Sequence, residues 1–194
     1  MNWLIFDYGE VISERTEALP ALAKEIGVEL DEFEKHYWAC RDPYDRGCSD
    51  LEYWASVGKA CGVDIDQSTS DALTAIDIEG WLHTEPATRE LLAALDEAGV
   101  ALALLSNAPS SFGRVAERQE WARHFRTLVF SGDLGCAKPD PEIFKILLDK
   151  LEAEPGDCLF FDDRQYNVDG ALAVGIRAHR WLGVNTAHAA GWTS

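Results

Sequence analysis

Short apolar runs alternate with amphipathic stretches along most of this chain. Five of the apolar runs have the length and composition of buried strands: 3–6, 101–105, 128–130, 159–161 and 176–181. Amphipathic segments that begin at Pro86 and Pro141 separate the later runs, and both repeat their apolar residues at helical spacing. Strands that alternate with helices form parallel sheets covered on both faces. The pattern therefore predicts an α/β fold with a Rossmann-like, doubly wound parallel sheet of about five strands.

Residues 14–83 break this alternation. The region has helical patterns at 19–26, 30–40, 51–61 and 71–81. It has no strand-like run, and it follows directly after the first expected strand. We therefore expect an α/β core built from residues 1–13 and 84–194, with a helical cap built from residues 14–83. A chain of 194 residues is long enough for one such core and a modest insertion.

Polar residues stand where the expected strands end. The positions that follow the first, second and fourth runs are Asp7, Ser106 with Asn107, and Asp162 with Asp163. The carboxyl ends of parallel strands meet at one edge of a sheet, and ligands of open α/β sheets bind there. Each of these residues alone is about as typical of a helix cap or a solvated turn. The ordered set indicates a site for phosphoryl transfer.

The carboxylates among these residues predict a metal site. Three carboxylates close together repel one another strongly unless a cation lies between them. Mg²⁺ prefers oxygen ligands, takes one or two carboxylates together with substrate phosphate, and neutralises charge on a phosphoryl group. We expect Asp7 to be the nucleophile that attacks phosphorus. The expected metal ligands are Asp7, Asp163, Asp162 and the backbone carbonyl of Gly9, where glycine lets the chain approach closely.

The other strand end and one loop supply groups for a phosphate. Ser106 and Asn107 precede a segment expected to be helical, and a hydroxyl with backbone N–H groups at a helix N-terminus cradles phosphate. Lys138 lies in a loop between glycine and prolines, where a solvated lysine is the default. Beside Asp7, its ammonium group would offset the charge of the nucleophile and hold a phosphate oxygen. Ser106, Asn107 and Lys138 are therefore the expected phosphoryl-binding residues.

Taken in order, these residues resemble the four motifs of the haloacid dehalogenase superfamily, specifically its phosphatases with a small cap. The motifs are Phe6-Asp7-Tyr8-Gly9-Glu10-Val11, Leu105-Ser106-Asn107, Lys138-Pro139-Asp140-Pro141-Glu142-Ile143-Phe144 and Phe160-Phe161-Asp162-Asp163. The resemblance covers nearly the whole chain and places residues 14–83 at the family's first-type cap. It implies Mg²⁺, a covalent phospho-enzyme and a small phosphorylated metabolite as substrate. The branch that looks most similar contains bacterial sugar-1-phosphate (glucose-1-phosphate) phosphatases.

One position departs from the family pattern. Most family phosphatases have a second Asp two residues after the nucleophile, which acts as general acid and base, and here that residue is Gly9. Glu10 follows it. Two alternatives stay open. A 2-haloacid dehalogenase attacks carbon without a metal, but that branch usually has Tyr two residues past the nucleophile, whereas Tyr8 is one residue past. A non-catalytic ligand-binding or regulatory relative is the other alternative.

The cap is the expected source of specificity. Trp38, Arg41, Tyr44 and Arg46 have spacings that place them on one helix face or in one loop. Arg41 and Tyr44 are the expected substrate-binding residues, through hydroxyl groups or a second anion on the substrate. Packing within the cap and surface ion pairs are the alternative explanation for the same residues.

Charge and composition exclude several classes of function. The net charge is −17, so the basic surface that nucleic acid or an anionic membrane requires is absent. No apolar run approaches the length of a membrane span, and no signal-peptide pattern precedes Asp7. The five cysteines are scattered without a CxxC motif, which is typical of reduced thiols in the cytoplasm. We therefore expect a cytoplasmic enzyme without nucleic-acid or membrane partners. The sequence leaves its oligomeric state open.

Overall fold

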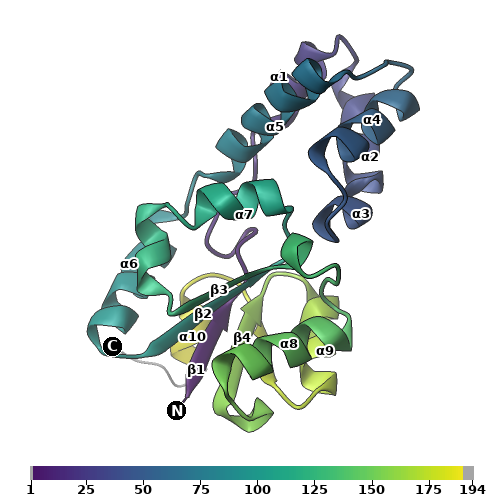
Figure 1. Ribbon diagram of the computed structural model, residues 1–194. Coiled ribbons are helices and arrows are strands. Elements are labelled where there is room, and N and C mark those ends of the chain that lie inside the picture. The colour runs from purple at the N-terminus through teal and green to yellow at the C-terminus, as the bar shows by residue number, and fades with distance from the viewer. Residues whose placement is uncertain (1, 190–194) are drawn as a thin grey trace.

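A five-stranded parallel sheet forms the centre of the molecule (Figure 1). The computed structural model describes residues 2–189. The strands are β1 (Trp3–Phe6), β2 (Ala101–Ser106), β3 (Thr127–Phe130), β4 (Cys158–Asp162) and β5 (Arg177–Arg180). Their order in the sheet is β3-β2-β1-β4-β5, and each pairing is parallel. The predicted fold class, a doubly wound α/β sheet with a helical insertion, is confirmed.

The helices of the core follow the strands along the chain. They are α6 (Pro86–Glu97), α7 (Ser110–Ala116), α8 (Pro141–Leu151), α9 (Gln165–Ala173) and α10 (Asn185–Ala189), with short 3-10 helices at Glu120–His124, Ser131–Asp133 and Pro155–Asp157. Both α6 and α8 begin at proline, as the sequence predicts. Asp140 occupies the N-cap position of α8, but its side chain makes no capping hydrogen bond. The Asp140 carboxylate pairs with Arg46 of the insertion instead.

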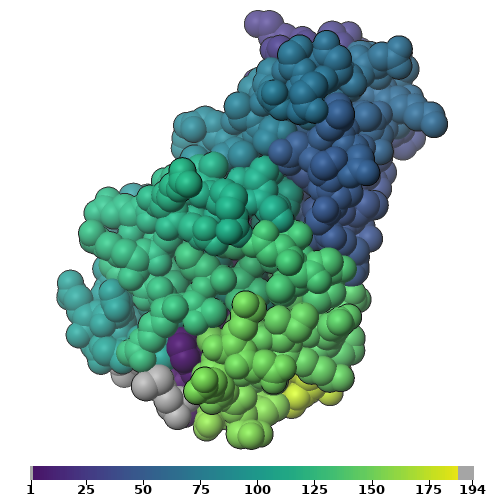
Figure 2. All heavy atoms as spheres, in the orientation of Figure 1, coloured from purple at the N-terminus to yellow at the C-terminus, as the bar shows by residue number. Residues whose placement is uncertain are grey.

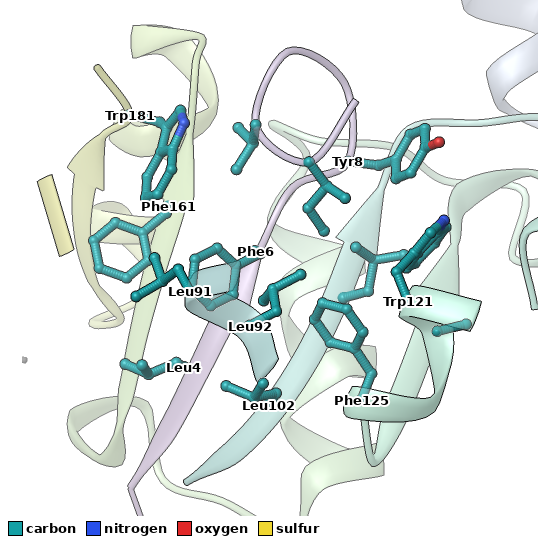
Figure 3. Close-up of a cluster of buried hydrophobic side chains, with 14 of the residues drawn as sticks. Leu4, Phe6, Tyr8, Leu91, Leu92, Leu102, Trp121, Phe125, Phe161 and Trp181 are labelled. Atoms are coloured by element: carbon teal, nitrogen blue, oxygen red, sulfur yellow. The ribbon is translucent and has the colours of Figure 1, made fainter. Parts of the chain in front are cut away.

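Alternate residues of the central strand pack into two different cores. Leu4 and Phe6 of β1 lie in one cluster with Leu92 of α6, and Figure 3 shows these side chains together. Ile5 lies in the other cluster with Phe144 of α8. Because β1 is buried along its whole length, both faces of the sheet must be covered by helices, as is usual for parallel sheets.

Helices α1 to α5, called the cap helices below, form a lobe beyond one end of the sheet (Figure 1). They are α1 (Leu19–Glu25), α2 (Leu30–Ala39), α3 (Arg41–Asp45), α4 (Asp50–Ala60) and α5 (Gln67–Trp81). Their interior is aromatic, since Tyr37, Tyr53 and Trp54 are each at most 1% exposed. α5 starts earlier than predicted because the Asp66 carboxylate accepts a hydrogen bond from the Thr69 N–H at 2.8 Å. The domain boundaries themselves stay a prediction.

The cap helices contact the core through α3 and the residues after it. Arg46 Nη1 donates to the Asp140 carboxylate at 2.5 Å, and the Ser131 hydroxyl donates to the Asp45 carbonyl at 2.5 Å. Figure 2 shows the blue atoms of the cap helices against the green atoms of the core. The lobe therefore lies over the carboxyl ends of the strands. Within residues 2–189, no helix has both the length and the apolar character that crossing a membrane requires.

Candidate active site

The register of the sheet brings the residues at the strand ends together. Phe6 of β1 pairs with Phe161 of β4, and the Asp7 N–H donates to the Phe161 carbonyl at 2.9 Å. Asp7 and Asp162 are therefore neighbours at the carboxyl edge of the sheet. One oxygen each from Asp7, Asp162 and Asp163 lie within 4.8 Å of one another. The three carboxylates form one acidic cluster.

Lys138 reaches this cluster from the loop before α8 and is 3% exposed. Its Nζ lies 2.7 Å from Asp7 Oδ1, 2.7 Å from Asp162 Oδ2 and 2.8 Å from the Leu105 carbonyl. An ammonium group has three donors, so each has a protein acceptor. Burial alone would lower the pKa of Lys138, but Asp162 and Asp7 outweigh burial and the pKa is raised. Lys138 therefore stays charged.

Asp162 is fully buried and fully paired. Its Oδ1 accepts from the Arg164 backbone N–H at 2.9 Å and from Asn167 Nδ2 at 3.0 Å. Its Oδ2 accepts from Lys138 Nζ at 2.7 Å and from the same Asn167 amide at 3.0 Å. This carboxylate is already occupied in holding Lys138 and Asn167, so it is less available to a metal than its two neighbours.

Asp7 and Asp163 keep unpaired oxygens. Among residues 2–189, Asp7 has Lys138 as its side-chain partner, and Asp163 has Arg164 Nε at 3.8 Å. Burial, only partly offset by Lys138, raises the pKa of Asp7 to about 7. Burial and the charge of Asp162 raise the pKa of Asp163 to about 6. A bound cation would remove both penalties, because it supplies the missing opposite charge.

Two further oxygen atoms beside these carboxylates are without partners in the described part of the chain. The Gly9 carbonyl accepts no hydrogen bond, and Oδ1 of Asn167 is buried and unpaired. Both residues line one cavity together with Asp7 and Asp163. Mg²⁺ takes carboxylate, carbonyl and water ligands. The free oxygens of Asp7, Asp163 and Gly9 therefore fit such an ion, and Asn167 Oδ1 fits an ion-bound water.

Hydrogen-bond donors face the same cavity from the end of β2. The Ser106 hydroxyl and the Asn107 backbone N–H have no acceptor among residues 2–189, and both residues line the cavity. The Asn107 side chain accepts from the Lys138 N–H at 2.8 Å and donates to the Lys138 carbonyl at 2.9 Å. It thereby ties the end of β2 to the Lys138 loop and places the free donors opposite the free oxygens.

The cavity, of about 470 Å³, separates the acidic cluster from the cap helices. Its volume and its mixture of aromatic and charged walls suit a small polar ligand. The cap helices and the residue after α3 contribute to its wall Trp38, Arg41, Asp42, Asp45, Arg46 and Trp81. The Tyr8 hydroxyl donates to the Trp81 carbonyl at 2.6 Å, which links the nucleophile loop to the end of α5.

Arg41 and Tyr44, the residues expected to bind substrate, occupy different places. Arg41 lines the cavity, but its guanidinium donates to Asp45 Oδ1 at 2.8 Å and lies 3.4 Å from Asp77. Tyr44 is 1% exposed, donates to Asp50 at 2.6 Å and is not part of the cavity wall. Substrate contact stays a prediction for Arg41, whereas Tyr44 lies behind the wall.

The cavity wall also includes residues that were not among the expected site residues, and Arg164, Tyr166 and Trp81 are the ones that matter below. For Arg164 a signal existed, because it follows Asp163 directly at the end of β4. Tyr166 and Trp81 carry no comparable signal, since an aromatic residue at a helix end is ordinarily part of the packing.

The sequence as a whole matches the family model of the haloacid dehalogenase-like hydrolases over residues 4–175. The chain belongs to this family. The predicted superfamily is therefore confirmed. The finer resemblance, to sugar-1-phosphate phosphatases, is not decided by this match.

This chain is 23% identical to one relative, a phosphoglycolate phosphatase of Pseudomonas putida, over 90% of this chain and 66% of the relative. It is 30% identical to a phosphorylated carbohydrates phosphatase of Thermotoga maritima, over 49% of this chain and 44% of the relative. The chain thus spans less than two thirds of the length of either relative.

Two solved structures share the fold. One is a haloacid dehalogenase family enzyme of Bacteroides thetaiotaomicron in complex with magnesium and inorganic phosphate, with a TM-score of 0.77, 19% identity and coverage of 97% and 98% of the two chains. The other is the L-2-haloacid dehalogenase of Xanthobacter autotrophicus, with a TM-score of 0.74, 16% identity and coverage of 100% and 84%. The fold is therefore shared with an enzyme solved with magnesium and inorganic phosphate and with a dehalogenase solved with chloropropionic acid covalently bound.

Proposed function

We propose that this hydrolase is a Mg²⁺-dependent phosphatase that hydrolyses a small phosphate monoester through an aspartyl-phosphate on Asp7. The observation that carries the proposal is that two sets of atoms without hydrogen-bond partners face the same cavity. Free oxygens of Asp7, Asp163 and Gly9 fit a hard cation, and the free donors of Ser106 and Asn107 fit phosphate oxygens. The phosphatase names of the two relatives support the same reaction.

In the proposed first step, an Asp7 oxygen forms a bond to phosphorus and the ester oxygen leaves with its bonding electrons. Ser106 and the Asn107 N–H donate to the equatorial oxygens, where the transition state carries its charge. Lys138 holds Asp7 in place and favours its ionised form. Bound Mg²⁺ supplies charge neutralisation of the phosphoryl group. Water then attacks phosphorus in the second step, which releases phosphate and restores Asp7.

The leaving group shapes the proposed substrate class. Gly9 has no side chain to protonate the leaving oxygen, so esters whose leaving group is already acidic are favoured. The anomeric hydroxyl of a sugar is more acidic than an ordinary alcohol. We therefore propose a sugar 1-phosphate as the substrate, held against Trp38 and Trp81 of the cavity wall. A small phosphorylated metabolite also fits the cavity of about 470 Å³.

A panel of a few dozen phosphorylated metabolites, assayed for phosphate release with Mg²⁺ and with excess EDTA, tests this function. We expect Mg²⁺-dependent release, with sugar 1-phosphates ahead of the corresponding 6-phosphates. Full activity in EDTA would reject the metal requirement, and turnover of 2-chloropropionate instead of any ester would favour the dehalogenase alternative. Binding of Mg²⁺ and phosphate without turnover of any ester would favour a non-catalytic relative.

A further inference from the structure

The cavity wall contains four cationic side chains, and they differ in how they are paired. Arg41 lies within 3.4 Å of two carboxylates, Asp45 and Asp77, and Lys138 lies 2.7 Å from each of two others. Arg46 likewise contacts two carboxylates, at 2.9 and 2.5 Å. These three charges are therefore neutralised within the protein.

Arg164 is the exception among these four. Its nearest carboxylate oxygen, on Asp163, is 3.8 Å from Nε, which is beyond hydrogen-bond distance. Within residues 2–189, Arg164 thus differs from the other three cations of the cavity wall, each of which lies within 3.4 Å of two carboxylates. The Arg164 side chain is 48% exposed and lines the cavity. Its charge is therefore available to a ligand.

The backbone and the neighbour of Arg164 hold it in place. The Arg164 N–H donates to Asp162 Oδ1 at 2.9 Å, which anchors the residue to the acidic cluster. Nη1 donates to the Tyr166 hydroxyl at 2.9 Å. Because the Tyr166 oxygen accepts this bond, its own proton stays free to donate. The pair thus presents a fixed cation together with a hydroxyl donor.

The depth of the cavity indicates which part of an ester would meet this pair. Asp7 is 7% exposed and lies at the inner end of the cavity, whereas Tyr166 is 50% exposed. A phosphoryl group on Asp7 therefore lies deep, and the leaving group extends outward toward Arg164 and Tyr166. A guanidinium binds a carboxylate through two parallel hydrogen bonds, with strength and orientation that a neutral hydroxyl does not match.

We propose that Arg164 and Tyr166 bind a carboxylate on the leaving group, so that the preferred substrate is the phosphate ester of a small acid, such as a sugar acid 1-phosphate. This inference rests on the proposed phosphatase function and names the chemistry of the outer end of its substrate. It differs from the expectation for Arg41 and Tyr44, because it assigns specificity to the loop after β4 and the start of α9.

A matched pair of esters tests the proposal. Glucose 1-phosphate and glucuronic acid 1-phosphate differ at C6, which is a hydroxymethyl group in one and a carboxylate in the other. The wild type should show a kcat/KM about tenfold higher for the acid. Arg164→Gln should abolish that preference, mainly through KM for the acid, and Arg164→Lys should retain part of it. Tyr166→Phe should weaken the preference by a few-fold.

Arg123→Gln is the matched control, because it removes one positive charge from an exposed residue outside the cavity. It should keep the preference for the acid. A second measurement does not depend on turnover: calorimetry in EDTA should show tighter binding of glucuronic acid 1-phosphate to the wild type than to Arg164→Gln. The Mg²⁺ affinity of Arg164→Gln should be equal or higher, because a cation beside Asp163 is lost.

The outcomes separate this inference from the proposed function. Absence of hydrolysis of any ester would reject the function. Hydrolysis without a preference for the acid would reject the role of Arg164 alone. An equal loss of kcat/KM for both esters in Arg164→Gln, or weaker Mg²⁺ binding, would also overturn it, because Arg164 would then support the acidic cluster or the transferred phosphoryl group instead.

Discussion

Two buried clusters of charged residues lie on opposite sides of the cavity, and their hydrogen bonding differs. In the cap helices, Asp77 accepts from the Tyr37 hydroxyl at 2.7 Å and lies 3.4 Å from Arg41, which also donates to Asp45 at 2.8 Å. The Tyr37 hydroxyl in turn accepts from Arg41 Nη1 at 2.7 Å. Every charged group of this cap cluster thus has a close partner.

The acidic cluster of the core is built from the same kinds of residues but is incomplete. Lys138 has used each of its donors, yet Asp7 and Asp163 keep free oxygens, and Asn167 Oδ1 is buried without a partner. Buried polar groups are normally satisfied, so the deficit marks the place where a ligand belongs. The comparison teaches that pairing, rather than the presence of charge, separates a structural cluster from a functional one.

The largest expected effect follows from Asp7→Asn. The amide is not a nucleophile, so turnover should fall by at least about 10⁴-fold, while the melting temperature should stay the same or rise, because a buried charge with a raised pKa is removed. Steady-state kinetics and a thermal melt measure both. Asp149→Asn, at an exposed position of α8, is the control. Normal turnover by Asp7→Asn would remove the mechanism.

In the cap cluster, by contrast, we expect a mutation to lower the stability of the fold. Arg41→Gln leaves Asp45 and Asp77 buried without their cation, and breaking a buried pair in this way costs about 3 kcal/mol of unfolding free energy. Denaturant unfolding should show this loss. If Arg41 also reads the substrate, KM for the natural ester should rise while a small aryl phosphate is little affected. A fully stable Arg41→Gln would contradict the structural account of this cluster.

The pH dependence of folding stability further distinguishes the acidic cluster. Burial raises the pKa of Asp7 to about 7 and that of Asp163 to about 6 in the metal-free fold, against 3.8 for an Asp side chain in water. The folded state therefore binds these protons more tightly than the unfolded state. Their stabilisation is complete below about pH 4 and is lost as the pH rises through 6 to 7.

Bound Mg²⁺ reverses this trend, because it requires the ionised carboxylates. Its affinity should rise about tenfold or more between pH 6 and pH 8. Melting curves with and without Mg²⁺ at both values measure the effect, and the metal-free melting temperature should be higher at pH 6. In Asp7→Asn this pH dependence should be smaller. A Mg²⁺ affinity that does not change with pH would argue against Asp7 and Asp163 as its ligands.

The smallest expected effect concerns Gly9. A Cβ atom at Gly9 would meet only Trp81, at 3.9 Å, and the backbone there is not left-handed, so Gly9→Asp has room for its side chain. The wild type should show kcat/KM rising steeply with leaving-group acidity across a series of aryl phosphates. Gly9→Asp should flatten the series, with a gain of about tenfold for the poorest leaving groups. A flat series in the wild type would indicate a general acid elsewhere, and Glu10→Gln would be the first variant to test.

The core cluster could be predicted from the sequence because its residues stand at the ends of recognisable apolar runs. Asp7, Ser106 and Asp162 end apolar runs that are readable as strands, and parallel strands bring those ends together. The cap cluster could not, since Arg41 and Asp77 are 36 positions apart and only tertiary packing joins them. The lack of a close carboxylate partner for Arg164 could not be predicted either, because it depends on the positions of all the side chains around the cavity.

Capture of the covalent intermediate tests the central claim most directly. With Gly9 in place of an acid that activates water, the aspartyl-phosphate should persist during turnover of a sugar 1-phosphate. Acid quenching during turnover with Mg²⁺, followed by peptide mass spectrometry, should show one phosphoryl group on Asp7, and none in Asp7→Asn or in EDTA. Steady release of phosphate with Asp7 unmodified at every quench time, or with the label on another residue, would contradict the account.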